Sequence, residues 1–397
     1  MRIVSVSTVF SDPTHAGKDI LSKLTRAADK PDSPQFVAFF GTPAVAEQSF
    51  YREIAPKLDR CAIHGATSSN GVVTTDWDPE TTLPLLGALA IYDPKGSYGS
   101  ASSKLDGDAE EIGRETTERA LRAAGRAGEA PELLFLSCAP GKEEAFLSGV
   151  RSIVGASTQI IGASSADDDL TGQWAQFSPE GFHQEGAVVS VLFPSCSITT
   201  ACDCGYEPTP SHGVVTSADQ RRIQSIDGEP AARVYGRWTD VVALVAADDA
   251  FNAGPIPYRM AAPLGRILGQ GSEAPDYALI QPYQVFEDGS LGVMADIREG
   301  ERLWGMKSDK ETLASRVSIL RELASFGQDD PPRAGLVVFC GTSTLKDEAT
   351  KRSLARELRV SFGDIPSLGV FSFGQQWMHE SGGFTHANQM MLCAIFR

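Results

Sequence analysis

Residues 160–169 read IIGASSADDD, and residues 62–71 read AIHGATSSNG. Both stretches lead from β-branched residues through a Gly-Ala pair into a run of hydroxyl side chains. Their glycines, Gly65 and Gly162, lie 97 positions apart (162 − 65). Each stretch follows an apolar run and then a segment with helical periodicity. We therefore expect two copies of one structural unit, each with a strand-to-loop turn at this point.

A third copy is expected over 334–397, where the corresponding stretch reads IPSLGVFSFGQQ. In each copy a buried apolar strand is followed by a helix, a second strand with a small-residue loop, and a closing strand. The spans from the small residue after the first strand to the loop glycine are 24 (Gly41 to Gly65), 23 (Ala139 to Gly162) and 28 (Gly341 to Gly369). This order predicts an α/β fold with mixed sheets built from repeated strand-helix-strand-strand units.

The segment before the third copy has a different character, and we expect a β-rich insertion there. Residues 196–208, CSITTACDCGYEP, alternate as a hairpin strand does, and RRIQSIDGEP carries an Asp-Gly turn signal. Residues 284–306 contain two turn signals between alternating runs, which predicts a meander. The boundary between the two parts of the chain is expected near 215–235.

Charge and composition exclude some partners. The chain has 35 basic and 51 acidic residues, a formal charge of −16, so phosphate backbones and anionic lipid surfaces should repel it. We therefore expect neither a nucleic-acid nor a membrane partner, and no apolar stretch approaches the roughly 20 residues of a membrane span. The seven scattered cysteines are typical of reduced thiols, which predicts a cytoplasmic protein.

Several stretches together resemble the FIST family of bacterial sensory domains. The matching stretches are FVAFFGTP, IHGATSSNGV, IIGASSADDD, SIDGEPAARVY, YRMAAPLGRI, EDGSLGVMADIREG, VVFCGTS, LGVFSFGQQ and THANQ. The resemblance implies a FIST N-terminal domain with two units over 30–228. It also implies a C-terminal domain over 229–380, with the β-rich segment and the third unit, and a closing strand over 381–397.

The resemblance further implies a function in signal transduction. Such a protein binds a small polar, amino-acid-like ligand and is not an enzyme. Because no output module is fused to this chain, its partner would be a separate signalling protein, such as a kinase or a cyclic-dinucleotide enzyme.

The loops supply most of the candidate ligand-binding residues. These are Gly65, Ser68, Ser69, Gly162, Ser164 and Ser165. The glycines would let the backbone approach a ligand or take a positive φ, and the hydroxyl and N–H groups would bind it. The alternative is a turn whose serines satisfy their own backbone.

Two charged sites outside the serine runs are further candidates. Asp167, with Asp168 and Asp169, could pair with an amino group or hold a divalent cation, although consecutive acids at a turn are more often solvated. Arg259 lies among apolar and proline residues and could hold a carboxylate through two hydrogen bonds. It could equally bridge loop carbonyls.

The resemblance adds candidates near the C-terminus. Gln375 stands in the third loop where the family often has an acid, and His386 and Asn388 match the family's histidine-asparagine motif. Some similar proteins bind haem and respond to nitric oxide, so a haem-based sensor using His64 or His386 is an alternative. A histidine satisfied within its loop is the favoured interpretation of each, and no Cys-x-x-Cys-His motif occurs. We therefore expect no cofactor and no metal.

A thiol-dependent enzyme is the remaining alternative. Cys138 ends a buried strand before a helix, where a thiol nucleophile could lie. Cys340 and Phe40 are read as its equivalents in the other copies, and a position that accepts phenylalanine indicates packing. The spacing of Cys196, Cys202 and Cys204 does not make the two pairs of a zinc site. Because no P-loop, HExxH, GxSxG or dinucleotide motif appears, we expect no catalytic residues.

Overall fold

The computed structural model describes residues 1–28, 33–239, 251–256, 262–270, 275–344, 347–379 and 383–397. The chain forms two compact units. Unit 1 consists of residues 1–203, 314–384 and 391–397, and unit 2 consists of residues 204–313 and 385–390. Both the mixed α/β sheets and the β-rich insertion agree with the expected fold class.

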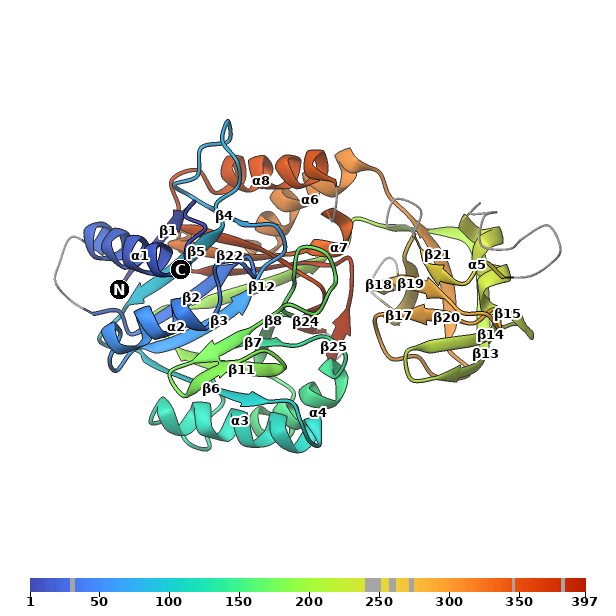
Figure 1. Ribbon diagram of the computed structural model, residues 1–397, viewed down its shortest axis with the longest axis horizontal. Helices are drawn as coiled ribbons and strands as arrows, with labels where there is room; N and C mark the ends of the chain where they lie inside the picture. The colour runs from blue at the N-terminus through green and yellow to red at the C-terminus, as the bar shows by residue number, and fades with distance from the viewer. Residues whose placement is uncertain (29–32, 240–250, 257–261, 271–274, 345–346, 380–382) are drawn as a thin grey trace. The chain divides into compact units, whose positions relative to one another are not determined.

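Unit 1 contains three repeats, each with six elements in the order strand, helix, strand, helix, strand, strand (Figure 1). The first repeat consists of β1 (Arg2–Thr8), α1 (Pro13–Ala28), β2 (Phe36–Gly41), α2 (Gln48–Ile54) with the 3₁₀ turn η1 (Ala55–Lys57), β3 (Ala62–Thr67) and β5 (Leu86–Tyr92). The second consists of β6 (Ser97–Lys104), α3 (Ala109–Ala123), β7 (Leu133–Cys138), α4 (Glu143–Val154), β8 (Gln159–Ala163) and β11 (Gly186–Phe193). The third consists of β12 (Ile198–Asp203), α6 (Lys310–Leu323), β22 (Ala334–Cys340), α8 (Glu348–Phe362), β23 (Ser367–Ser372) and β26 (Met391–Phe396).

Each repeat forms a four-stranded sheet with the same strand order. The orders are β1-β5-β2-β3, β6-β11-β7-β8 and β12-β26-β22-β23. The last two strands of each list are parallel, and the others pair antiparallel. The repeat is thus longer than the expected four elements, because a strand and a helix precede each copy. One expectation is wrong: residues 198–203 form no hairpin with their neighbours but pair with β26.

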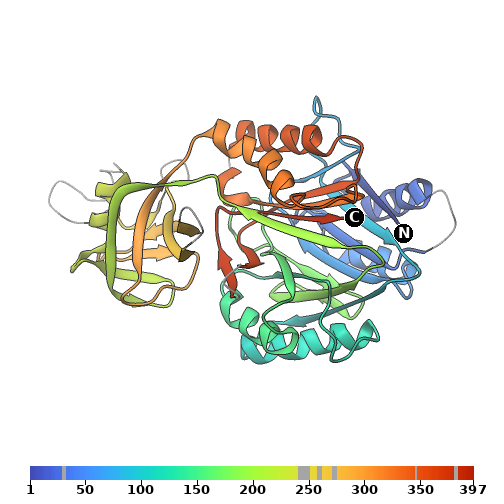
Figure 2. The same ribbon diagram turned by 180° about the vertical axis from the view of Figure 1, so that it is seen from behind.

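Helices cover one face of each sheet. In α1, Ile20 and Leu24 are buried in one cluster with Val4 and Val6 of β1, and each such side chain contributes roughly 1.5–3 kcal/mol. The helices α3 and α4 lie side by side (Figure 1), and two glycines, Gly113 of α3 and Gly149 of α4, set their separation. A Cβ on Gly149 would lie 1.9 Å from the carbonyl oxygen of Glu110, so only glycine permits this approach. The helices α6 and α8 lie side by side in both views (Figure 1 and Figure 2).

The opposite faces of the first two sheets pack against each other. Phe40 of β2 meets Phe135 of β7 with ring centroids 5.8 Å apart, and His64 of β3 stacks on the same ring at 3.9 Å. Strands buried on both faces explain why β2 and β7 read as continuous apolar runs.

The repeats exchange edge strands. The short strands are β4 (Val72–Thr74), β9 (Gln176–Ser178), β10 (Gly181–His183) and β24 (Gln375–Met378). Strand β9 of the second repeat pairs with β3 of the first, and β24 of the third pairs with β8 of the second. Strand β4 of the first repeat pairs with β23 of the third, which closes the cycle. The short helix α7 (Gly341–Thr344) follows β22.

Unit 2 is inserted between the first strand and the first helix of the third repeat. Its elements are β13 (Glu207–Asp219), β14 (Arg222–Ile226), β15 (Glu229–Pro230), α5 (Ala231–Thr239), β16 (Gly254–Pro255), β17 (Leu264–Gln270), β18 (Pro275–Ile280), β19 (Pro282–Val285), β20 (Leu291–Val293) and β21 (Arg302–Lys307). The strand β25 (Phe384–Ala387) carries the chain from unit 1 into residues 385–390.

The sheet of unit 2 has the order β16-β19-β20-β14-β13-β21-β17-β18, with β15 paired to β14. The Asp-Gly signal is confirmed, because Asp227 and Gly228 both have positive φ, 51° and 79°, in the β14–β15 hairpin. The predicted meander is only partly present: β19 and β20 form a hairpin, but β21 pairs with β13 and β17.

Within the described residues, no helix is long and apolar enough to cross a membrane.

Candidate functional site

The three loops begin at equivalent glycines. In the parallel ladders, Gly65 lies opposite Phe39, Gly162 opposite Leu136 and Gly369 opposite Val337. On the other side, the same glycines face the exchanged strands, at Phe177, Gln376 and Val73. The loops therefore lie at the carboxyl ends of the second parallel strands, the edge at which open α/β sheets bind ligands.

Gly65 and Gly162 leave room for the exchanged strands. A Cβ on Gly65 would lie 2.0 Å from the ring of Phe177, and one on Gly162 would lie 2.4 Å from Oε1 of Gln376. Neither glycine has a positive φ. The close approach that glycine permits here is thus to a side chain of a neighbouring repeat.

The third residue after each glycine is a serine that holds an exchanged strand. The donors and acceptors are Ser68 Oγ to Gly71 O (2.7 Å), Ser165 Oγ to Ala175 O (3.4 Å) and Ser372 Oγ to Gly374 O (3.1 Å). Each accepting carbonyl lies two residues before the residue that pairs with the loop glycine of another repeat. Because the three hydroxyls make the same contact, Gly-x-x-Ser is the pattern that the three loops share.

A ring of backbone hydrogen bonds joins the loops. The contacts are Ser69 N–H to Phe371 O (2.9 Å), Ala166 N–H to Thr67 O (3.1 Å) and Phe373 N–H to Ser164 O (3.2 Å). In each hydrogen bond, the donor is the N–H of the fourth residue after one loop glycine. The acceptor is the carbonyl of the second residue after the loop glycine of another repeat. The three loops therefore converge on one another, and their serines are almost fully buried.

A buried carboxylate supports the second loop. Glu143, at the start of α4 and 2% exposed, accepts hydrogen bonds from the Gly141 N–H at 2.7 Å and the Ser164 hydroxyl at 3.0 Å. Gln376 Nε2 donates to the same hydroxyl at 2.8 Å. The side chain of Gln375 lies in the third loop, where its Nε2 donates to Ser372 Oγ at 2.8 Å.

The three consecutive acids fold the second loop and join it to the first. Asp167 accepts backbone N–H groups from residues 170, 172 and 173 at 2.6, 2.7 and 2.9 Å, and its side chain is fully buried. Asp168 Oδ1 accepts the Asn70 N–H at 2.5 Å, and Asp169 accepts the Thr171 hydroxyl. Burial raises the pKa of Asp168, although the hydrogen bond from Asn70 lowers it.

Two of the remaining predicted ligand residues lie in unit 2. In unit 2, His386 Nε2 lies 3.2 Å from the Met294 carbonyl, and Asn388 Oδ1 accepts the Gln281 N–H at 3.0 Å. Arg259 lies outside the described residues.

His64 does not fit the role of a haem ligand. It is fully buried, with Nδ1 3.0 Å from Ser190 Oγ and Nε2 3.0 Å from Ser137 Oγ. Both ring nitrogens are therefore engaged by serines. Burial also lowers the pKa of His64 to about 3, so the imidazole is neutral.

Cys138 has no exposed surface, which does not suit a nucleophile. Its backbone carbonyl accepts the Ser165 N–H at 2.9 Å, so the residue supports the second loop. The sequence comparison between the copies was wrong by one position. The strand registers align Cys138 with Gly41 and Phe339. Each of the three lies two residues after the residue that pairs with the loop glycine in the parallel ladder of its repeat.

Sequence reasoning missed Ser372, Glu143 and the exchanged-strand residues. Ser372 lies between two phenylalanines, so its loop does not read as hydroxyl-rich. The Gly-x-x-Ser spacing would have found it. The exchanged strands are only three or four residues long and carry no such signal.

The fold and site define a class of protein. It has three α/β repeats that exchange edge strands, with a β-rich unit inserted into the last repeat. Comparison with families then identifies it. The FIST N domain matches residues 35–229 and the FIST C domain matches residues 231–378, so the chain belongs to the FIST family. FIST domains are small-ligand sensory domains of signalling proteins.

Other comparisons gave distant likenesses. A search of curated proteins found no match. The crystal structure of cyanuric acid hydrolase from A. caulinodans is similar with a TM-score of 0.39 and 9% identity, over 99% of this chain and 98% of that one. The structure of PurLQS from Thermotoga maritima has a TM-score of 0.23 and 10% identity, over 100% of this chain and 71% of that one. At these values neither likeness bears on activity.

Proposed function

We propose that this FIST protein is a cytoplasmic sensor, and not an enzyme, that binds a small polar, amino-acid-like ligand where its three loops meet. It passes ligand occupancy to a separate signalling protein, such as a kinase or a cyclic-dinucleotide enzyme. The observation that carries the proposal is the convergence of the three Gly-x-x-Ser loops at the carboxyl ends of their strands.

Three buried polar atoms beside the loops support a ligand there. Thr42 Oγ1, Trp174 Nε1 and Gln176 Nε2 have no hydrogen-bond partner among the described residues. Thr42 follows Gly41, whose carbonyl accepts the Ser68 N–H, and the other two flank Ala175. A buried polar group without a partner costs roughly 1–3 kcal/mol, so a polar ligand that satisfies these groups gains affinity.

The strand exchange suggests how occupancy is transmitted. Each loop is continuous with a strand that forms the edge of another repeat's sheet. A ligand that draws the loops together therefore moves the edges of all three sheets. Such a ligand favours one of two arrangements of the loops, and the partner protein reads that arrangement.

Thr42→Val tests the proposal with L-amino acids as probes in thermal unfolding. At least one amino acid should raise the melting temperature of the wild type. Valine is isosteric and removes a hydroxyl that has no hydrogen-bond partner in the described part of the chain, so the unliganded protein should be as stable as before or more so. The shift caused by the amino acid should be lost.

Thr117→Val is the matched control. Thr117 is fully buried and donates to the Gly113 carbonyl at 2.7 Å within α3. This variant should lose about 1 kcal/mol of stability while keeping the ligand-induced shift. Two results contradict the proposal: no amino acid stabilises the wild type, or Thr42→Val keeps the full shift.

A further inference from the structure

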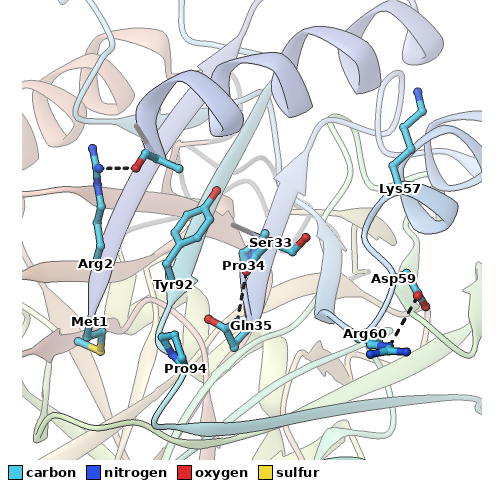
Figure 3. Close-up of a pocket in the computed structure, with 11 residues that line it drawn as sticks. Met1, Arg2, Ser33, Pro34, Gln35, Lys57, Asp59, Arg60, Tyr92 and Pro94 are labelled. Carbon is cyan, nitrogen blue, oxygen red and sulfur yellow. Dashed lines mark hydrogen bonds and ion pairs between the residues drawn. The ribbon is translucent and has the colours of Figure 1, made fainter. Parts of the chain in front are cut away.

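A pocket of about 890 Å³ lies at the opposite edge of the first sheet from the three loops. Gln35 and Arg60, which line it, precede the strands β2 and β3, whereas the loops follow these strands. Tyr92, at the end of β5, forms part of its wall (Figure 3). The volume lies within the roughly 300–1,000 Å³ that small-molecule sites occupy.

The described residues of the pocket wall carry a net positive charge, opposite to that of the whole chain. Arg2, Lys57 and Arg60 line it, and among the described residues of its wall Asp59 is the single carboxylate. The chain as a whole has a net charge of −16. Because a local group of cations in an acidic protein attracts anions to that place, the ligand class that suits the pocket is anionic.

The three cations differ in how firmly they are held. Arg2 donates to the carbonyls of Ala27 and Ala28 at the end of α1, and Lys57 pairs with Glu53 one helical turn away. The guanidinium of Arg60 lies 3.9 Å from the Asp59 carboxylate, with exposed fractions of 93% and 88%. Such an exposed pair is weak, so Arg60 can turn to an incoming anion at little cost.

Arg60 also has an unusual backbone conformation. Its φ is 63°, in the left-handed region that glycine adopts without strain. The tight turn around it is closed by the Cys61 N–H, which donates to the Leu58 carbonyl at 3.1 Å. A backbone outlier beside a pocket makes the Arg60 side chain a candidate for a function there.

Between Arg2 and Arg60, the wall carries three side chains with apolar rings (Figure 3). It contains the ring of Tyr92 with Pro34 and Pro94. The Tyr92 hydroxyl lies 3.4 Å from the Leu24 carbonyl, and Gln35 Oε1 accepts the Asp93 N–H at 2.6 Å, so both side chains are held in place. A planar group can therefore lie on this surface with an anion beside Arg60.

We propose that this pocket is a second ligand site, which binds a small organic anion with a flat apolar part. Arg60 takes the carboxylate or phosphate, and Tyr92 contacts the flat part. The site is independent of the function proposed for the loops, because the two lie at opposite edges of the sheet.

Isothermal titration calorimetry at low salt tests the pocket with benzoate and phenyl phosphate as probes. At least one should bind the wild type, and Arg60→Gly should weaken that binding by about tenfold or more, because a charge-assisted hydrogen bond is lost. Glycine suits the positive φ, so the variant should fold at least as stably. Asp59→Asn, which removes the carboxylate that pairs with Arg60, should tighten binding.

Arg122→Ala is the control, because it removes the same charge from an exposed position on α3 outside the pocket. It should leave probe affinity unchanged. Binding of benzoate alone would identify a carboxylate ligand, and binding of phenyl phosphate alone a phosphate ligand. The proposal is overturned if neither probe binds, if Arg122→Ala weakens binding as much as Arg60→Gly does, or if benzyl alcohol or inorganic phosphate binds as tightly as the probes.

Discussion

At the scale of single residues, His64 connects the first two repeats. It comes from β3, and both serines that its ring nitrogens contact belong to the second repeat, Ser137 on β7 and Ser190 on β11. Ser190 continues the network to Ser100 at 2.7 Å. A polar network in which every ring nitrogen has a partner fixes one arrangement of the two sheets, whereas apolar contacts alone would allow several.

The buried imidazole should make stability depend on pH. The His64 pKa is about 3 in the folded protein and near 6.5 in the unfolded chain, so below pH 6.5 only the unfolded state binds this proton. The free energy of unfolding therefore falls as pH drops from 6.5 toward 3. Between pH 7.5 and 5.0 the loss from this residue should be about 2 kcal/mol.

Urea unfolding at the two pH values measures this effect. In His64→Gln, which keeps a side chain able to bond both serines, the loss between pH 7.5 and 5.0 should be smaller by that amount. His15→Gln is the control, since His15 is exposed. An unchanged pH dependence in His64→Gln would show that this residue is not the titrating group.

At the scale of elements, the exchanged strands depend on the three serines that hold them. Ser68 makes two contacts, donating to Gly71 O at 2.7 Å and accepting the Phe371 N–H at 2.9 Å. Ser165 makes one contact with its strand, at 3.4 Å. The serine hydroxyl of the Gly-x-x-Ser pattern is thus more strongly hydrogen-bonded in the first repeat than in the second.

Serine-to-alanine substitutions should reflect this difference. Ser68→Ala leaves a buried N–H and a buried carbonyl without a partner, so it should cost about 2–4 kcal/mol, whereas Ser165→Ala should cost about 1 kcal/mol or less. Guanidinium unfolding of both variants measures the costs. Equal costs, or a larger cost for Ser165→Ala, would contradict the assignment of the hydroxyls to strand attachment.

The sequence predicted the local features of these elements better than their partners. Apolar runs located β2, β7 and β22, and the Asp-Gly signal located the β14–β15 hairpin, because each depends on neighbouring residues. The exchange of β4, β9 and β24 could not be predicted, since a strand of three or four residues acquires its register only from a distant partner. The misplaced equivalence of Cys138 has a similar cause, because only ladder registers align strand ends across helices of different length.

The candidate site was predicted in part. The recurrence of small residues located the three loops and predicted that they lie at strand ends. The sequence could not show that backbone N–H groups of one loop would bond to carbonyls of another, because every residue type except proline can make such backbone contacts. Ser69 and Ser164 therefore looked like free ligand contacts, although their backbones belong to the ring.

At the scale of the whole molecule, unit 2 is an insertion into a complete architecture. The chain leaves unit 1 after Asp203 and re-enters it at Ala314. Within unit 1, the carboxylate of Asp203 forms an ion pair with Arg316 at 3.3 Å. The two ends of the insertion are thus fixed close together in unit 1. All four strands of each repeat's sheet lie in unit 1.

A shortened chain tests this independence. Replacing residues 204–309 and 385–390 by short glycine-serine linkers should leave a protein that unfolds in one cooperative transition, because the three repeats keep their helices and their strand exchange. Circular dichroism during heating measures the transition. Weak, non-cooperative unfolding would show that unit 1 needs unit 2 for its stability.

The cycle of exchanged strands has a consequence for synthesis on the ribosome. Strand β4 is made early but pairs with β23, which emerges almost 300 residues later, and β26 is the last strand made yet lies between β12 and β22. Until then, the nascent chain exposes unpaired strand edges that invite aggregation. Chaperone binding during translation should therefore persist until the third repeat has left the exit tunnel.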